Sequence, residues 1–452
     1  MKSLFADKFF YHIYPLGLCA SPHQNDFCCP AGNAFERLEG ELERLHAMGI
    51  NALYIGPVFE SSSHGYDTVD YYHVDRRLGN NESFKHFCAC CHQQGIAVVL
   101  DAVFNHTGRD FFAFRDLQQN GQNSQYKGWY LNLDFSRRSN FGDCFDYEGW
   151  AGHKQLVKLD VDNEAVREHL FGAVDFWMQE FGIDGLRLDA ADVLSKSFLD
   201  ALSAHCKAKK LDFWLMGEVV HGDYNDWVRE GRLDSVTNYQ LYKALWSSLN
   251  DKNFFELSYN LDREFGANGM YDYSPLYNFL DNHDVNRIAS TVKKAEHLYL
   301  LYALMFCIPG IPSVYYGSEW GIRGKRTDFG DRELRPALPP FVQSFSDDIR
   351  PSVDSAALVS LITRFSDLRK NHPSLQTGTY KLVNVTNQTL AFTRSGNGET
   401  LMVCFNCDDK AHDVSLTGAD NSKGFEDILD GTKFPAGTKT VSVNSNWMRI
   451  LR

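Results

Sequence analysis

IAVVLDAVFNH at 96–106 is the stretch that decides the fold, because its apolar run ends directly on Asp101. The same arrangement, a short apolar segment followed at once by an acid, recurs in FGIDGLRLD at 181–189, FWLMGE at 213–218 and LYNFLDNHD at 276–284. Short apolar runs of this kind are typical of buried strands in a parallel sheet. A parallel α/β barrel gathers the carboxyl ends of its strands at one face, where its chemistry takes place. The four stretches therefore predict a barrel with converging carboxylates.

Strand-like and helix-like patterns alternate along most of the chain, which extends the prediction of a barrel beyond these four stretches. From about residue 10 to about residue 365, short apolar segments alternate with amphipathic helical patterns, which is typical of repeated βα units. Further strands are predicted at 10–14, 52–55 and 313–316, and helices at 35–48, 83–94, 163–181 and 296–306. The fold class that we expect is α/β, a (β/α)8 TIM barrel.

Two stretches depart from this alternation. Residues 107–153 have neither a helical nor a strand period but are rich in Gly, Asn, Asp and aromatic residues, which predicts an ordered, irregular lobe over the active face. After residues 372–373 the pattern changes to short alternating segments separated by turn residues. We therefore expect a barrel built from 1–106 and 154–372, a lobe inserted after the third strand at 107–153, and a C-terminal antiparallel β-sandwich at 373–452.

Composition narrows the class of protein. The chain has 452 residues, 44% of them hydrophobic, enough for a large core and two or three domains. Its net charge of −13, without a block of Lys and Arg, argues against nucleic acid or a membrane as partner. The first ten residues are too interrupted for a secretory signal, and no stretch reaches the roughly 18 apolar residues of a membrane span. We therefore expect a cytoplasmic protein.

The number and spacing of the cysteines also favour the cytoplasm. The chain has 11 of them, an odd number with irregular spacing, which indicates reduced thiols instead of a disulfide framework. They form two clusters, at 88–91 and 404–407. A structural zinc site would need a second ligand pair at suitable spacing, and none is evident in the sequence. We therefore predict no metal site from these cysteines.

The acids at the strand ends have the residue types that acid/base and nucleophilic chemistry on an uncharged substrate such as a sugar requires. Arg187 and Asp189 are two residues apart on one predicted strand, so their side chains point to the same side, and the arginine keeps the aspartate ionised as a nucleophile must be. Glu218 ends the next strand, and a nearby carboxylate such as Asp284 would raise its pKa and make it a proton donor. An isolated Asp after a strand more often caps the next helix, but four independent caps in one repeat explain the pattern poorly.

These segments resemble the motifs of the α-amylase family of retaining glycoside hydrolases, and they occur in that family's order. The matching segments are DAVFNH at 101–106, GLRLDAAD at 185–192, GEVVH at 217–221 and FLDNHD at 279–284, supported by HGYDTVDYYHVDRRLG at 64–79 and VKLD at 157–160. Together with RELRPAL at 332–338, they look most like the neopullulanase, cyclomaltodextrinase and maltogenic amylase branch. The resemblance covers nearly the whole chain.

The resemblance implies roles for the three acids. Asp189 would be the nucleophile, Glu218 the general acid/base, and Asp284 a third acid that holds sugar hydroxyls and helps to distort the ring. Arg187 would support the nucleophile. Asp101 is better explained as a scaffold residue near Arg187.

The resemblance also implies a set of substrate-binding residues besides Arg187. Tyr66 would stack on the sugar at the reacting subsite, where His106 and His283 would donate hydrogen bonds, and His221 would contact substrate from the GEVVH motif. Asp331 and Arg335 would touch the next sugar, with a surface ion pair as the alternative explanation.

The chain departs from the family pattern in two places. The first barrel strand begins almost at once, so we expect the branch's N-terminal β-domain to be absent and the protein to be a monomer or a weak homodimer. Many relatives bind calcium through the position of Asn105 and a histidine where this chain has Val193, so we expect the usual calcium site to be lost, with the loop at 143–146 as a remaining candidate. No motif for a redox or phosphate-bearing cofactor is apparent, so we expect none to be required.

The resemblance implies hydrolysis of α-1,4 bonds in malto-oligosaccharides, with cyclodextrins as a further substrate, through a covalent glycosyl-enzyme intermediate. The alternatives in the family are a 4-α-glucanotransferase and an exo-acting α-glucosidase, which use the same three acids. A more remote alternative is a non-catalytic carbohydrate-binding protein on the same barrel. Loss of one acid would favour that alternative, but Asp189, Glu218 and Asp284 are all present.

Overall fold

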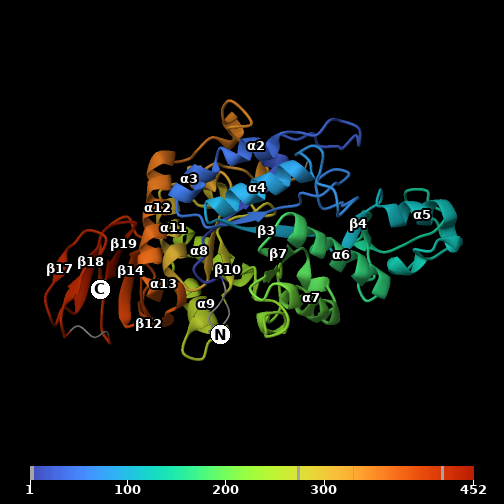
Figure 1. The fold of residues 1–452 in the computed structure, drawn as a ribbon. Helices are drawn as coiled ribbons and strands as arrows, with labels where there is room; N and C mark the ends of the chain where they lie inside the picture. Colours follow the sequence, from blue (N-terminus) through green and yellow to red (C-terminus); the bar gives the residue numbers. More distant parts are fainter. Residues whose placement is uncertain (1–4, 272–274, 329, 419–421) are drawn as a thin grey trace.

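Eight parallel strands form the central sheet of the computed structural model, which describes residues 5–271, 275–328, 330–418 and 422–452 (Figure 1). In chain order the strands are β1 Phe10–Ile13, β2 Ala52–Ile55, β3 Ala97–Ala102, β7 Gly185–Leu188, β8 Trp214–Gly217, β9 Ser235–Val236, β10 Tyr277–Phe279 and β11 Ile311–Tyr315. Each strand pairs with the next in parallel, β11 pairs with β1, and a bridge between Thr237 and Tyr277 joins the ends of the sheet. The predicted barrel is confirmed.

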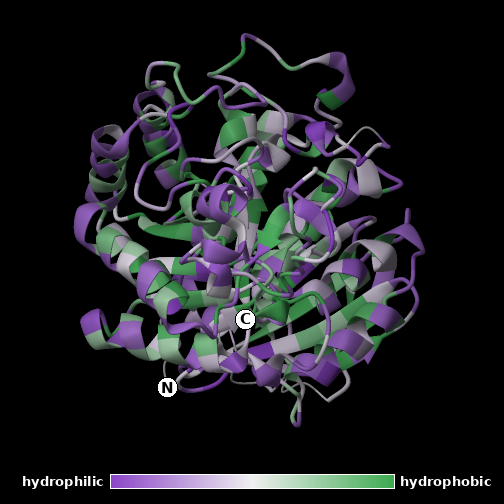
Figure 2. Ribbon diagram, turned by 90° about the vertical axis from the view of Figure 1, so that its right-hand side faces the viewer, coloured by the Kyte–Doolittle hydropathy of each residue, from purple (hydrophilic) through white to green (hydrophobic). Residues whose placement is uncertain are grey.

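Helices surround this barrel. The main ones are α2 Ala34–Glu39, α3 Leu42–Ala47, α4 Asn81–Gln93, α6 Glu164–Glu180, α7 Lys196–Lys209, α8 Tyr239–Asn250, α9 Phe255–Phe265, α11 His297–Cys307 and α12 Ser355–Asn371, with the short α1 Pro15–Leu18, α10 Ile288–Thr291 and α13 Pro373–Thr377. Figure 2 shows hydrophobic stretches gathered toward the middle and hydrophilic ones along the outer helices. The single helix predicted at 35–48 is two helices, α2 and α3, because the chain breaks at Gly40, a residue with low helix propensity.

Large side chains fill the interior of the barrel below its active face. Trp214 stacks on Phe5 and Phe10 at ring-centroid distances of 4.8 and 5.2 Å. Tyr54, Val99, Tyr277 and Ile311 belong to the same buried cluster. A barrel plugged in this way is a packed core and not a pore, so polar groups collect at the carboxyl ends of the strands.

The inserted lobe follows β3, as predicted, but it is more regular than its sequence pattern indicates. It contains β4 His106–Gly108, α5 Phe112–Asn120, β5 Gly149–Trp150 and β6 His153–Lys158, with β6 between β4 and β5 in an antiparallel sheet. Elements of two to nine residues are too short to give a clear period. Phe114 packs edge-on against Tyr130 and Tyr147, which accounts for the aromatic content.

The C-terminal part is antiparallel, as predicted. Its main sheet has the order β12 Thr379–Val385, β13 Thr389–Gly396, β14 Glu399–Asn406 and β19 Trp447–Leu451. Two further strand pairs are β15 His412–Ser415 with β18 Thr440–Val443, and β16 Phe425–Glu426 with β17 Lys433–Phe434. Within the described ranges, every helix is too short or too polar to traverse a lipid bilayer.

Candidate active site

Arg187 is the centre of a buried charge network at the carboxyl ends of β3, β7 and β8. Its Nη1 lies 2.8 Å from Asp101 Oδ1 and 2.8 Å from Asp189 Oδ1, and its Nη2 lies 2.9 Å from Glu218 Oε2. Burial by itself lowers the pKa of this guanidinium, but Asp101 and Glu218 raise it well above its usual value. Arg187 therefore stays charged and orients three carboxylates that come from three different strands.

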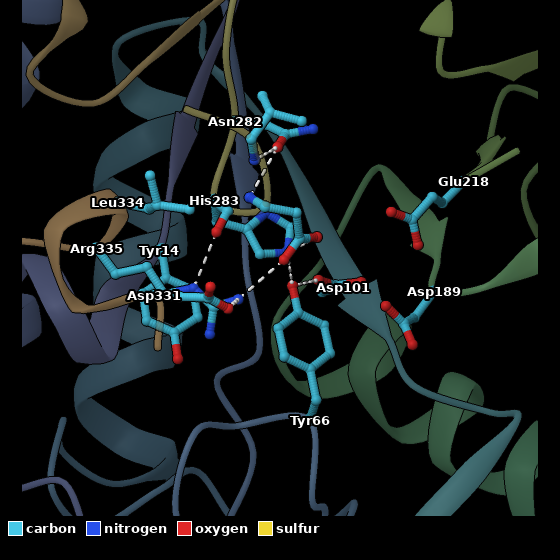
Figure 3. Close-up of polar contacts among 12 residues, drawn as sticks. Tyr14, Tyr66, Asp101, Asp189, Glu218, Asn282, His283, Asp331, Leu334 and Arg335 are labelled. Atoms are coloured by element: carbon cyan, nitrogen blue, oxygen red, sulfur yellow. Dashed lines mark hydrogen bonds and ion pairs between the residues drawn. The ribbon is translucent and has the colours of Figure 1, made fainter. Parts of the chain in front are cut away.

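The turn after Asp189 connects this acid to Glu218. Ala190 has φ 46°, in the left-handed region that a residue with a side chain seldom adopts. In this conformation its backbone N–H donates to Glu218 Oε2 at 3.1 Å. The strained turn thus places Asp189 and Glu218 on the same side of Arg187, and Figure 3 shows their carboxyl groups facing the same space.

Burial raises the pKa of both acids of this pair. Contrary to the expectation that Arg187 keeps Asp189 ionised, the pKa of Asp189 lies well above its usual value, because burial outweighs Arg187 and the charges of Glu218 and Asp101 act in the same direction as burial. The pKa of Glu218 is also raised, by burial first and further by Asp284, against the opposing effect of Arg187. Two buried carboxylates that share one guanidinium favour the uptake of one proton by the pair.

The pKa of Asp284 is shifted in the opposite direction, below its usual value. Its Oδ2 lies 3.0 Å from His283 Nε2 and its Oδ1 lies 2.9 Å from Arg335 Nη2. Burial would raise its pKa, but His283 and Arg335 hold it far below the usual range. The side-chain oxygen Oδ1 of Asn282 accepts from the Asp284 backbone N–H at 2.8 Å and so fixes the turn after β10. Asp284 is therefore a firmly ionised carboxylate, and 34% of its side chain remains exposed.

Tyr66 joins the two halves of the site. Its hydroxyl donates to Asp101 Oδ2 at 2.9 Å and lies 2.6 Å from His283 Nε2 (Figure 3). The rings of Tyr66 and His283 are stacked, with centroids 5.4 Å apart and planes 9° apart. Tyr66 therefore connects the Arg187 network to the Asp284 network, besides presenting an aromatic ring at the site.

His106 lies beneath Tyr66 at the start of β4. Its Nε2 is 3.0 Å from the Tyr66 carbonyl oxygen, and its Nδ1 is 3.1 Å from Asn105 Nδ2. Because a carbonyl only accepts, Nε2 carries the proton. Burial lowers the pKa of this imidazole to about 4, so it is neutral at pH 7. Both ring nitrogens are engaged by the protein, which the sequence pattern did not indicate.

The outer side of the site is formed by Arg335 and Asp331. Arg335 Nη2 lies 3.2 Å from Asp331 Oδ2, and its Nε donates to the His283 carbonyl oxygen at 3.0 Å. The pair lies against Asp284 and not on a remote surface. His221, in contrast, is exposed after β8, and among the contacts of the described residues it has no hydrogen bond or ion pair.

Several residues of the network were not predicted. Tyr54 on β2 donates to Asp101 Oδ2 at 2.8 Å. The guanidinium of Arg335 lies 4.8 Å from the ring centroid of Tyr14, whose hydroxyl donates to the His64 carbonyl oxygen at 2.6 Å. The Asn282 amide donates to the Tyr239 hydroxyl at 2.9 Å. The signal for Tyr14 and Tyr54 is their position at or near strand ends, but an aromatic residue there is equally compatible with core packing.

The residues considered for calcium do not fit that ion. The side chain of Val193 offers no ligand atom, and the Asn105 side-chain amide lies 3.1 Å from His106 Nδ1. Asp143 receives both amino groups of Arg109, at 2.8 Å each, and Asp146 pairs with Lys154. The carboxylates are thus already neutralised by cationic side chains, and a calcium site of this composition is not supported.

Paired carboxylates at the active face of a TIM barrel, held around one arginine, place the protein in the class of barrel glycosidases. The protein-family model described as "Alpha amylase, catalytic domain" matches residues 37–349 of the sequence. The chain therefore belongs to the α-amylase family and is a glycoside hydrolase.

Individual relatives narrow the branch. A Bacillus sp. cyclomaltodextrinase is 30% identical over 433 residues, which cover 90% of this chain and 74% of that protein. An intracellular maltogenic amylase from Bacillus subtilis strain 168 is 28% identical over 403 residues, 87% of this chain and 65% of that protein. The ligand-free cyclic α-maltosyl-(1→6)-maltose hydrolase from Arthrobacter globiformis has a TM-score of 0.80 and 26% identity, and covers 99% of this chain and 98% of that one. The chain thus resembles the cyclomaltodextrinase and maltogenic amylase branch.

Proposed function

We propose that the protein hydrolyses α-1,4 bonds of malto-oligosaccharides with retention of configuration, through a covalent glycosyl-enzyme intermediate. The observation that supports this proposal most directly is the shared guanidinium: Arg187 holds Asp189 on Nη1 at 2.8 Å and Glu218 on Nη2 at 2.9 Å. Retaining glycosidases need two carboxyl groups about 5–5.5 Å apart, one as nucleophile and one as acid/base. Two acids bound to the two amino groups of one arginine are close enough for these two roles.

In the first step, Asp189 attacks the anomeric carbon while Glu218 protonates the departing glycosidic oxygen. The proton comes from the pair, because burial raises the pKa of both acids. Arg187 stabilises Asp189 as an anion once Glu218 holds the proton. In the second step, Glu218 takes a proton from water, which attacks the same carbon and releases Asp189.

Asp284 binds the sugar that reacts. It is ionised and partly exposed, so its oxygens can accept hydrogen bonds from sugar hydroxyls while His283 and Arg335 hold it in place. The ring of Tyr66 provides a stacking surface beside it. Arg335 with Asp331 contacts the neighbouring sugar. His106 positions Tyr66 through its hydrogen bond to the Tyr66 carbonyl oxygen.

The substrate class is argued from the relatives. The names cyclomaltodextrinase and maltogenic amylase indicate short or cyclic α-glucans, so we include cyclodextrins among the substrates. The intracellular relative favours a cytoplasmic enzyme that acts on imported malto-oligosaccharides. We expect activity without an added cofactor and a monomer or weak homodimer.

The experiment is a product time course from maltoheptaose, with β-cyclodextrin and pullulan in parallel, resolved by chromatography. Mixed short oligomers at early times support endo-hydrolysis. Products longer than maltoheptaose would instead identify a 4-α-glucanotransferase, and glucose alone an exo-acting α-glucosidase. If none of the three substrates is turned over, the proposed substrate class is wrong.

A further inference from the structure

Helices α2 and α4 carry a group of side chains that the glycosidase chemistry does not use. The two helices lie next to each other (Figure 1), with Phe35 packed on Phe84 and Phe87 at ring-centroid distances of 4.8 and 5.7 Å. Glu39 is the last residue of α2, and His86 and Cys90 lie on α4. Residues four apart on a helix share one face, so His86 and Cys90 both meet Glu39.

The spacing of the three donor atoms is that of a metal site. His86 Nε2 lies 3.7 Å from Glu39 Oε2 and 3.7 Å from Cys90 Sγ, and all three atoms are within 4.8 Å of one another. The first distance is too long for a normal hydrogen bond. Zinc–ligand bonds of about 2.0–2.3 Å place neighbouring tetrahedral ligands about 3.3–3.6 Å apart. The two separations from His86 Nε2 are within a few tenths of an ångström of this spacing, and the third, within 4.8 Å, reaches it after a side-chain shift of about 1 Å at most.

The charges around the group also favour a cation. Glu39 Oε1 is buried and lacks a hydrogen-bond partner within the described part of the chain, although the side chain as a whole is 22% exposed. The ion-pair partner of Glu39 among the described residues is His86, which is not a permanent cation. A bound metal ion would neutralise this carboxylate and stabilise a thiolate at Cys90.

We propose that Glu39, His86 and Cys90 bind a divalent transition-metal ion, for which zinc is the best match, with water at the open fourth position. A thiolate, an imidazole and a carboxylate are zinc ligands, whereas calcium and magnesium require oxygen. The sequence pattern predicted no metal site from the cysteine cluster at 88–91, because only the fold brings Glu39 to Cys90 and His86. Cys88 and Cys91 are fully buried and are not part of the site.

The position of the site predicts a structural role. A helix that follows a barrel strand returns toward the amino-terminal ends of the strands, and Cys90 lies in the last turn of α4. The metal site is therefore toward the face opposite Asp189 and Glu218. It would fasten α2 to α4, so binding raises the melting temperature and leaves turnover of substrate unchanged.

The test uses the whole protein, treated with chelator, kept reduced, and titrated with Co²⁺ and then Zn²⁺. We expect one equivalent of Co²⁺ with a thiolate-to-cobalt absorption band, loss of this band when Zn²⁺ is added, and a melting temperature that rises with Zn²⁺ concentration. Cys90→Ser and His86→Ala should each lower the affinity by at least about tenfold, and Glu39→Gln should lower it too.

The matched control is Cys29→Ser, which removes a partly exposed cysteine on a loop elsewhere. It should leave the titration unchanged. The proposal is wrong if the wild-type protein gives no thiolate band, if the band survives in Cys90→Ser, or if it disappears in Cys29→Ser. None of these outcomes bears on the glycosidase function, because the readouts are metal binding and stability.

Discussion

Arg335 Nη2 lies 2.9 Å from Asp284 Oδ1, so a residue that follows β11 and its loop holds the acid that follows β10. The second oxygen of Asp284 is 3.0 Å from His283 Nε2, and Arg335 also binds the His283 carbonyl oxygen. The position and the charge of Asp284 thus depend on a contact across 51 residues of chain.

Arg335→Ala should raise the pKa of Asp284 and thereby change the pH dependence of activity. Asp284 has a pKa far below its usual value, so its charge supports folding and activity above the usual Asp pKa, and this support is lost as pH falls. Without Arg335 the pKa of Asp284 rises, so the acid limb of kcat/KM moves to higher pH. Loss of a charge-assisted hydrogen bond should also lower kcat/KM about tenfold to a hundredfold at pH 7. An unshifted acid limb would contradict this relationship.

Asp189→Asn should lower the rate of maltoheptaose turnover at least about a thousandfold, because the amide cannot form the glycosyl-enzyme ester. The side chain keeps its shape, so the melting temperature should change little. Asp192→Asn, three residues along in the same motif, is the matched control and should stay within about twofold of wild type. Steady-state rates of both variants decide the outcome, and an active Asp189→Asn variant would remove Asp189 from the mechanism.

Glu218→Gln should discriminate between leaving groups. Turnover of maltoheptaose requires protonation of a sugar oxygen, whereas fluoride departs without it. The rate loss with maltoheptaose should therefore be at least about a hundredfold, and the first-step loss with α-maltosyl fluoride much smaller. Stopped-flow fluoride release measures that step. Equal losses for both substrates would argue against Glu218 as the general acid.

Tyr66→Phe should lower kcat/KM about tenfold, because it removes the hydroxyl that joins Asp101 to His283 but keeps the ring. The comparison with Tyr66→Ala separates the two functions of the side chain. The Ala variant should additionally raise KM, since it removes the stacking surface. If Phe and Ala variants have equal kinetics, the ring does not contact substrate.

Removal of calcium with EGTA should leave both activity and melting temperature unchanged. The carboxylates of Asp143 and Asp146 are neutralised by Arg109 and Lys154, so we expect the lobe to fold without an added cation. Arg109→Ala should instead lower the melting temperature and expose the lobe to limited proteolysis. A stabilisation of the wild-type protein by added calcium would contradict this prediction.

Local patterns were sufficient to predict the barrel and to select its acids. Apolar runs that end on Asp101, Asp189 and Glu218 are signals of single strands, and parallel packing then brings their ends to one face. The same patterns failed where elements are short, as in α5 and β4, and where one glycine divides a helix, as at Gly40. They also did not show that both nitrogens of His106 are engaged by the protein.

What the sequence alone determined is therefore the fold, the family resemblance and the identity of the candidate acids, because each depends on residues close together in the chain. The tertiary structure decided how these acids are charged and oriented. Arg187 between Asp189 and Glu218, Arg335 on Asp284, and Glu39 beside Cys90 are contacts between separate elements. Hydrogen bonds and electrostatic effects depend on distances in space, and those distances are set only when the strands and helices pack.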